Sequence, residues 1–434
     1  MSASISTRTL LLPLRTTFTL RPLNTRTFAT IMPVAVNKAS ISADVGGQHN
    51  VDQLAKISRD FRSDTITVPT DSMLVAGIKA SRGDDVYRDD PATIELENRI
   101  ANLTGKEAGL FLVSGTMSNQ LAIRSTLAQP PHSVITDHRA HVHQVREAGG
   151  IAVFSQATTH ALPPRNGHHL TLEDDILPNL QLGNDIHTAP TRLICLENTL
   201  AGTVFPQDEI VKISEEAAKH DIIMHLDGAR IWEVAARVCH ERGLPMQDEG
   251  LGIALKELCA PFNTISLCLS KGIGAPIGSV LVGPKPLIER ARWFRKMFGG
   301  GIRQSGAIAT AASVALTEHF PKLIGTHGLA RKLADGVQAL GGKFVYPTET
   351  NMVWVDLASL GIPLKDLQAA GEALEQPLVI RGARFVVHHQ ITEQAIDDLL
   401  ILFKELQDKH RAKQGDLDAI NEKRPQEKLI AGQY

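Results

Sequence analysis

Between Val51 and Gly306 the chain alternates short, almost wholly apolar runs with helical patterns, and this alternation constrains its fold more than any other feature. Runs that are apolar at nearly every position are typical of strands buried on both faces of a parallel sheet. Strands that alternate with helices indicate an α/β fold. The expected strands are Ala108–Val113, Ser133–Thr136, Arg192–Leu196, Ile222–Leu226, Thr264–Leu269 and Ser279–Val282. We therefore predict a large domain over residues 51–306 with a mostly parallel sheet.

One helix of this domain is marked at both ends. Asp90 is a good N-cap, Pro91 suits the first turn, and Gly105 can end the helix. The sequence therefore predicts a helix between Asp90 and Gly105.

After Gly306 an Ala-rich helical segment leads into a smaller unit over residues 307–407. Its expected elements are a strand at Met352–Val355, a helix after Pro363, paired strands around Leu378–Ile380 and Phe385–Val387, and a helix from Thr392. This mixture indicates a small C-terminal α+β domain. Residues 408–434 are polar and charged, and we expect a tail that frays.

Residues 1–45 differ from the rest of the chain in composition. The first acidic residue is Asp44, whereas arginines at positions 8, 15, 21 and 26 lie among Ser, Thr and Leu. A start that is rich in Arg and Ser and free of acids is typical of a mitochondrial transit peptide. The alternatives are a disordered tail, or a start at Met32 that would leave a cytosolic protein.

The charge balance and apolar runs exclude two classes of protein. Lys plus Arg number 45 against 47 Asp plus Glu, so the formal net charge is -2 and nucleic acid is not an expected partner. No apolar run reaches the roughly 18 to 20 residues of a membrane-spanning helix, so a membrane is not expected either.

The four cysteines form no CxxC pair and lie in or near apolar stretches. We expect buried free thiols in a reducing compartment.

Small residues follow the first expected strand, in the sequence Ser114-Gly115-Thr116. A strand followed by small residues and a helix leaves free backbone N–H groups at a positive helix end, which can bind a phosphate. A tight turn with an ordinary cap is the alternative at this position.

Two further strand ends carry a charged residue. Asp227 ends an apolar run, so its carboxylate should be partly desolvated and in need of a cationic partner. A simple salt bridge with Arg230 is the alternative to a functional role for Asp227. Lys271 also follows a buried run, with glycines on its far side, and a lysine beside apolar walls suits a Schiff-base nucleophile. A snorkelling lysine at the sheet edge is the alternative.

Taken together, the three strand ends are far more specific than any one of them. A phosphate cradle, a desolvated carboxylate and a poised lysine, in this chain order, match the needs of pyridoxal 5'-phosphate. Open α/β sheets bind ligands outside the carboxyl ends of their strands, where all three lie. The sequence therefore predicts this cofactor.

Several motifs in the same order resemble those of the low-specificity L-threonine aldolases, within the aspartate-aminotransferase-like group of pyridoxal phosphate enzymes. The likeness runs from about Phe61 to Leu402. The matching segments are Phe61–Thr65, Gly83–Tyr87, Asp90–Pro91, Phe111–Asn119, Leu196–Thr199, His225–Arg230, Cys268–Gly272 and Phe298–Gln304. The resemblance implies an aspartate-aminotransferase-like large domain and a lyase that acts on a small amino acid.

The resemblance also implies roles for particular residues. Lys271 is expected to form the Schiff base with the cofactor, and Asp227 to pair with its ring nitrogen. Ser114, Gly115 and Thr116 are expected around the phosphate. A third set, near the substrate carboxylate or a neighbouring cofactor oxygen, consists of Ser63, Arg230 and Arg384. The loop expected to help build a neighbouring subunit's site, and hence to imply a homodimer or homotetramer, contains Gly299, Gly300, Gly301 and Arg303.

A histidine that stacks on the cofactor ring is also implied by the resemblance. The context Arg139-Ala140-His141 favours His141, but the spacing to the next Gly-rich turn is one residue longer than usual, so His143 stays open. No acidic or Cys ligands accompany these histidines at suitable spacing, so no metal is expected. The sequence departs from many relatives at Leu200, where they carry a histidine that contacts the substrate hydroxyl.

The expected reaction is cleavage of L-threonine or L-allo-threonine to glycine and acetaldehyde. His141, His143 and a bound water are the candidate bases. A racemase acting on alanine is the first alternative, because fungal relatives of this fold include such enzymes and Leu200 lacks the hydroxyl-binding group. A cofactor-free Schiff-base aldolase on a TIM barrel needs eight βα units, more than the chain supplies. A non-catalytic binding protein would not need both Lys271 and Asp227.

Overall fold

The computed structural model describes residues 41–127, 132–143, 147–183 and 185–423 of the chain, with side chains up to residue 412. The predicted transit segment, apart from residues 41–45, and the alternative start at Met32 therefore lie outside the described residues. So do residues 424–434 of the predicted tail. None of the helices in the described ranges is both long enough and apolar enough to cross a bilayer.

The larger part of the described chain is built on a seven-stranded sheet of order β1-β7-β6-β5-β4-β2-β3. Its strands are β1 (Ala108–Leu112), β2 (Ser133–Asp137), β3 (Thr158–Leu162), β4 (Thr191–Glu197), β5 (Ile223–Asp227), β6 (Thr264–Cys268) and β7 (Ser279–Gly283). Only β7 runs antiparallel to its neighbours, β1 and β6, so the mostly parallel sheet is confirmed. All six expected strands are present. The edge strand β3 was not predicted because its partly exposed sequence lacks a continuous apolar run.

Helices α4, α5, α6 and α9 pack directly on this sheet. The helices of this part of the chain are α1 (Ala43–Gly46), α2 (Gln48–Ile57), α3 (Asp71–Lys79), α4 (Pro91–Thr104), α5 (Gly115–Thr126), α6 (Gln207–Lys219), α7 (Ile231–Arg242), α8 (Asp248–Cys259), α9 (Lys285–Met297) and α10 (Gly306–His319). The predicted ends of α4 are confirmed: the Thr93 backbone N–H donates to Asp90 Oδ1 over 2.8 Å, and Gly105 closes the helix with a φ of 70°. Apolar side chains of the sheet and these helices form the main core.

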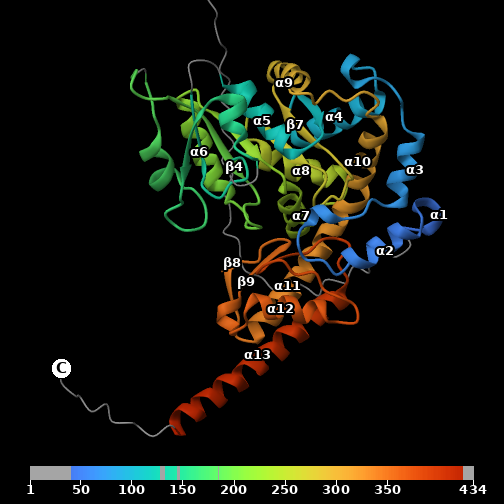
Figure 1. Ribbon diagram of the computed structural model, residues 1–434. Coiled ribbons are helices and arrows are strands. Elements are labelled where there is room, and N and C mark those ends of the chain that lie inside the picture. Colours follow the sequence, from blue (N-terminus) through green and yellow to red (C-terminus); the bar gives the residue numbers. More distant parts are fainter. Residues whose placement is uncertain (1–40, 128–131, 144–146, 184, 424–434) are drawn as a thin grey trace, which may run out of the picture. The chain divides into compact units, whose positions relative to one another are not determined.

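The smaller unit contains a three-stranded antiparallel sheet of order β10-β9-β8. Its elements are α11 (Leu323–Ala339), β8 (Lys343–Tyr346), β9 (Met352–Asp356), α12 (Leu364–Glu372), β10 (Arg384–Val386) and α13 (Glu393–Lys423). Figure 1 draws these elements in orange and red, and α11 and α12 both pack against α13. The last helix continues through residue 408, where we expected a polar tail to begin.

The predicted pairing of Leu378–Ile380 with Phe385–Val387 is wrong. Val379 instead forms a parallel bridge with Asp60, and its carbonyl accepts from the Phe61 backbone N–H. Phe61 is buried in the core of the smaller unit and packs edge-on against Phe385, with ring centroids 6.1 Å apart. The segment that leads into Ser63 is therefore held by the smaller unit, although we had assigned residues 51–306 to the large domain.

Shorter helical turns join these elements. They span Asp64–Ile66, Asp85–Tyr87, Ile151–Ser155, Leu172–Ile176, Leu177–Asn179, Phe320–Lys322 and Leu357–Leu360. The first of them carries Asp64, which is buried in the candidate site.

Candidate active site

Two buried carboxylates lie next to each other at the carboxyl edge of the sheet. Glu197 ends β4 and Asp227 ends β5, and the two residues are partners in the register of these parallel strands. Each residue is only 3% exposed. Buried carboxylates require hydrogen-bond donors or cations, and their partners define the site.

Asp227 is held by two donors. Its Oδ2 accepts from Asn119 Nδ2 over 3.0 Å, and its Oδ1 accepts from the backbone N–H of Ala229 over 3.1 Å. Asn119 lies on α5, so this contact connects the end of β5 to the helix that follows β1. Both donors are uncharged, so they stabilise the carboxylate and leave its charge to be balanced by a cationic ligand.

The residues predicted to bind a phosphate lie at the amino end of α5. Ser114 is the N-cap, with its Oγ accepting from the Met117 backbone N–H over 3.1 Å, and Gly115 is the first residue of the helix. The first N–H groups of a helix have no partner within it, and the helix dipole adds positive potential there. Ser114, Gly115 and Thr116 therefore present donors to an anion.

Lys271 lies in the turn after β6 and is half-buried. The turn is held by hydrogen bonds from the Gly274 backbone N–H to the Lys271 carbonyl, over 2.8 Å, and from the Ala275 backbone N–H to the Leu269 carbonyl. Gly274 has a φ of 74°, which favours glycine at this position. Lys271 is close enough to Asp64 for its charge to act on the pKa of that carboxyl.

A buried ion pair joins the two units at this site. Arg230 donates from Nε to Asp64 Oδ2 over 2.8 Å and from Nη2 to Asp64 Oδ1 over 2.7 Å. Burial acts to raise the pKa of Asp64, but the charge and hydrogen bonds of Arg230 outweigh it and hold the pKa below its usual range. Arg230 therefore pairs with Asp64. The alternative from the sequence, a simple salt bridge between Arg230 and Asp227, is wrong.

Ser63 and Arg384, both predicted near the substrate carboxylate, lie close to this ion pair. Ser63 directly precedes Asp64, and its Oγ accepts from the Thr65 backbone N–H. Arg384 is on β10 and donates from Nη2 to the carbonyl of Arg62 over 3.0 Å. The structure therefore brings Ser63, Arg384 and, through Asp64, Arg230 to the same region.

His141 is oriented by Glu197 through two contacts. The His141 backbone N–H donates to Glu197 Oε2 over 2.8 Å, and its ring Nδ1 lies 2.6 Å from Glu197 Oε1. Because an ionised carboxylate only accepts, Nδ1 carries the hydrogen and Nε2 stays available. His143, the alternative, is half-buried, and its backbone N–H donates to the Ala140 carbonyl.

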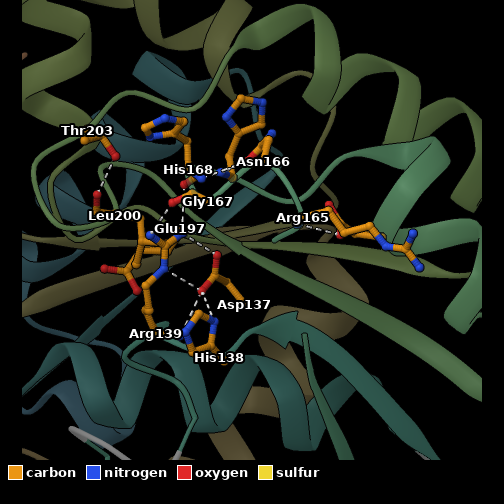
Figure 2. A network of polar contacts seen from close by, with 12 residues as sticks. Asp137, His138, Arg139, Arg165, Asn166, Gly167, His168, Glu197, Leu200 and Thr203 are labelled. Atoms are coloured by element: carbon orange, nitrogen blue, oxygen red, sulfur yellow. Dashed lines mark hydrogen bonds and ion pairs between the residues drawn. The ribbon is translucent and has the colours of Figure 1, made fainter. Parts of the chain in front are cut away.

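The loop beside His141 is tied to the sheet by Arg139. Figure 2 shows Arg139 against Asp137, and the two form an ion pair with Nη2 2.8 Å from Oδ2. The same guanidinium donates to the carbonyls of His168, over 2.7 Å, and Gly167, over 3.4 Å. Arg139 therefore holds the 163–169 loop close to the strand that leads into His141.

Leu200 follows β4 by three residues and is 6% exposed. It exchanges two backbone hydrogen bonds with Thr203, whose hydroxyl also donates to the Leu200 carbonyl over 2.7 Å. This turn holds an apolar side chain in place, so the position supplies no hydrogen-bonding group.

The predicted subunit-interface loop follows α9. Arg303 is exposed and pairs with Asp84, with Nη1 3.0 Å from Oδ2. Gly299 has a φ of 80°, and Gly300 and Gly301 complete the turn. The role of this loop in a neighbouring subunit stays a prediction.

Sequence reasoning did not assign roles to Asp64, Glu197 or Asn119. Each lies inside a motif that carried the resemblance, and the structure places Glu197 at the end of a buried strand beside Asp227. Arg230 is 166 positions from Asp64, His141 is 56 from Glu197 and Asp227 is 108 from Asn119, so these contacts depend on the fold. The four cysteines are free and buried. Within the described ranges, no cluster of three or more His, Cys, Asp or Glu residues is arranged to hold a metal ion.

Comparisons with known proteins agree on one family. The beta-eliminating lyase model matches residues 60–359. A Schizosaccharomyces pombe protein named probable low-specificity L-threonine aldolase is 46% identical over 340 residues, which are 78% of this chain and 85% of that protein. A Cochliobolus carbonum protein named alanine racemase is 36% identical over 356 residues, which are 80% of this chain and 87% of the other. The solved structure of Leishmania major threonine aldolase has the same fold, with a TM-score of 0.64, 19% identity, and coverage of 80% of this chain and 99% of that one.

Proposed function

This chain belongs to the low-specificity L-threonine aldolases, within the beta-eliminating lyases, and on that premise we propose that it cleaves L-threonine and L-allo-threonine to glycine and acetaldehyde. The proposed cofactor is pyridoxal 5'-phosphate. The observation that carries this function is the placement of Asp227, Lys271 and the amino end of α5 after the strands of one sheet. In metabolic terms, the enzyme breaks down threonine and forms glycine.

The residues at the sheet edge fit this cofactor. Asp227 is a buried carboxylate bound by uncharged donors, which suits a protonated ring nitrogen. The amino end of α5 suits the phosphate, and Lys271 has an amine that can condense with the aldehyde. When bound, pyridoxal phosphate supplies an electron sink for a carbanion at the substrate Cα.

The residues of the chain would then have distinct tasks. Asp227 keeps a proton on the ring nitrogen, and Ser114, Gly115 and Thr116 bind the phosphate. The β-hydroxyl proton goes to a base as the Cα–Cβ bond breaks. The bonding electrons stay on Cα, which later takes a proton to give glycine, and the β-carbon leaves as acetaldehyde. His141 is the base we favour, because Glu197 orients its ring and leaves Nε2 available.

The substrate carboxylate is assigned to Arg384, with Ser63 and Arg230 nearby. A guanidinium can bind both oxygens of a carboxylate through parallel N–H groups. Arg230 already uses two N–H groups on Asp64, which supports a positioning role for it. Arg384 comes from the smaller unit, so movement of that unit would change substrate binding.

The decisive experiment measures acetaldehyde release from L-threonine and from L-allo-threonine by the purified protein with added pyridoxal phosphate. Release from either substrate is the expected result. If protein that binds the cofactor releases acetaldehyde from neither, the aldolase function is excluded.

A second candidate function is racemisation of alanine. It is favoured by the 36% identical relative named alanine racemase and by Leu200, which offers no group to a substrate hydroxyl. Incubation of L-alanine with the enzyme, followed by chiral analysis, tests it. Formation of D-alanine without acetaldehyde from threonine would select this function over the first.

Assembly and location are part of the proposal. We infer a homodimer or homotetramer in which the loop containing Gly299, Gly300, Gly301 and Arg303 contributes to a neighbouring site; the exposure of Arg303 and Trp293 supports a role in contact. Light scattering tests the assembly.

We also propose a mitochondrial location directed by residues 1–45. A reporter protein fused to residues 1–43 tests this location, and a reporter that remains in the cytosol contradicts it.

A further inference from the structure

Asn119 connects Asp227 to a second buried carboxyl group, which the mechanism above does not use. Its Nδ2 donates to Asp227 Oδ2 over 3.0 Å and to Glu147 Oε1 over 2.8 Å. Glu147 is 5% exposed and lies just before the Gly149-Gly150 turn. The two N–H groups of the Asn119 amide therefore donate to two different carboxyl groups, one from Asp227 and one from Glu147.

The other end of Asn119 is also occupied. Its Oδ1 lies 3.1 Å from His225 Nε2, and His225 Nδ1 lies 2.8 Å from Thr264 Oγ1. Because the amide oxygen only accepts, His225 donates from Nε2 and its Nδ1 accepts from the Thr264 hydroxyl. Burial lowers the pKa of His225 to about 4, so this ring is neutral. The orientation of Asn119 is thus set from both sides.

Two ionised carboxylates on one amide would repel each other in this buried place, so one of them is expected to hold a proton. Burial, and after it the negative charge of Asp227, raise the pKa of Glu147 to about 8, although hydrogen bonds from Asn119 and Gln120 oppose the rise. Glu197 on β4 adds to it. Cys195, on the same strand, stays a neutral thiol because burial raises its pKa.

The contact between Gln120 Nε2 and Glu147 Oε2 can also be made by a protonated Glu147. Gln120 Nε2 and Glu147 Oε2 are 2.6 Å apart. With the Gln120 amide turned by half a turn, its oxygen would lie at the position assigned to the nitrogen and would accept from the hydroxyl of a protonated Glu147.

We propose that Glu147 is a positioning residue that, as a neutral acid, holds Asn119 against Asp227 and leaves Asp227 as the ionised partner of the cofactor's ring nitrogen. The role given to Asp227 rests on the proposed function. The neutral state of Glu147 does not rest on it, because it follows from the contacts of the protein without cofactor.

Two variants separate a neutral acid from a carboxylate. Glu147→Gln keeps an oxygen for Asn119 and an N–H donor for Gln120, as a neutral acid does. Glu147→Ala removes both contacts. We expect Glu147→Gln to bind pyridoxal phosphate within about threefold of wild type, and Glu147→Ala to bind roughly tenfold or more weakly. The dissociation constant is measured from the absorbance change of the cofactor.

A second readout needs neither cofactor nor activity. The infrared spectrum of the cofactor-free wild-type protein near neutral pH should contain the carbonyl band of a buried carboxylic acid. The difference between this spectrum and that of Glu147→Gln should show that the variant has lost the band. Glu173→Gln, which changes an exposed glutamate, is the matched control and should leave the band in place. Thermal unfolding of each variant tests whether it is folded.

The outcomes distinguish this inference from the proposed function. If Glu147→Gln binds the cofactor as weakly as Glu147→Ala, or if the acid band is absent from wild type, the inference is overturned whether or not threonine is cleaved. If the band and the binding pattern are as expected but no acetaldehyde forms, the neutral positioning acid stands and the aldolase function fails.

Discussion

His141 Nδ1 lies 2.6 Å from Glu197 Oε1, and the side chain of Glu197 is only 2% exposed. This pair joins a residue that follows β2 to the last residue of β4. It determines which ring nitrogen of His141 carries the hydrogen, and it supports His141 over His143 as the histidine of the site.

Replacing Glu197 with Gln is expected to lower kcat for threonine cleavage by roughly 10- to 100-fold. The amide removes the charge that stabilises a protonated imidazole and no longer enforces the hydrogen on Nδ1. Steady-state assays of acetaldehyde release measure the effect. Glu173→Gln is the matched control and should keep wild-type activity. An unchanged kcat in Glu197→Gln would contradict the assignment of His141 as base.

Lys271→Ala should abolish turnover, because the variant has no amine to hold the cofactor covalently. Lys271 is half-buried in a glycine-rich turn, so the substitution should leave thermal unfolding nearly unchanged. The comparison is acetaldehyde release by variant and wild type at equal cofactor occupancy. Substantial cleavage by the variant would exclude the role of Lys271.

Asp64→Asn should destabilise the fold by about 3–5 kcal/mol, the usual cost of leaving one member of a buried ion pair without its partner. Arg230 would lose its carboxylate partner in a place where both side chains are almost fully buried. Urea unfolding measures the change. The matched control is Glu257→Gln, which breaks the exposed pair with Arg242 and should cost at most about 1 kcal/mol. Equal losses in both variants would contradict the importance of burial.

The same pair predicts how stability depends on pH. The folded-state pKa of Asp64 lies below its unfolded-state value, so its contribution is fully present above about pH 4 and is lost as the pH falls further. Wild type should therefore lose more stability between about pH 4 and pH 2 than Asp64→Asn does. Parallel stability curves for the two proteins in this range would show that Asp64 does not contribute.

Leu200→His should widen the difference between the two threonine diastereomers, because it adds a hydrogen-bonding group where wild type has an apolar one. A change of roughly three- to tenfold in the ratio of kcat/KM values is expected. Leu200→Met, which keeps volume and apolarity, is the control and should leave the ratio unchanged. If both variants have the wild-type ratio, position 200 does not contact the hydroxyl.

The sequence by itself determined six of the seven strands of the sheet and two of the charged residues at its edge. Runs such as Ile222–Leu226 are apolar at every position except His225, and this local pattern indicates a buried strand. Asp227 and Lys271 were recognisable because each follows such a run. The two ends of α4 were recognisable because Asp90 and Gly105 act on their own neighbours.

Only the tertiary structure decided which distant residues meet. A salt bridge from Arg230 to Asp227, three positions away, was one alternative from the sequence, yet Arg230 pairs with Asp64, 166 positions earlier in the chain. Likewise, Val379 pairs with Asp60 and not with a neighbouring strand. Local periodicity reports which face of an element is buried, whereas these pairs depend on strand order and on the packing of the smaller unit. Both arise from contacts between segments far apart in the chain, and no local pattern records them.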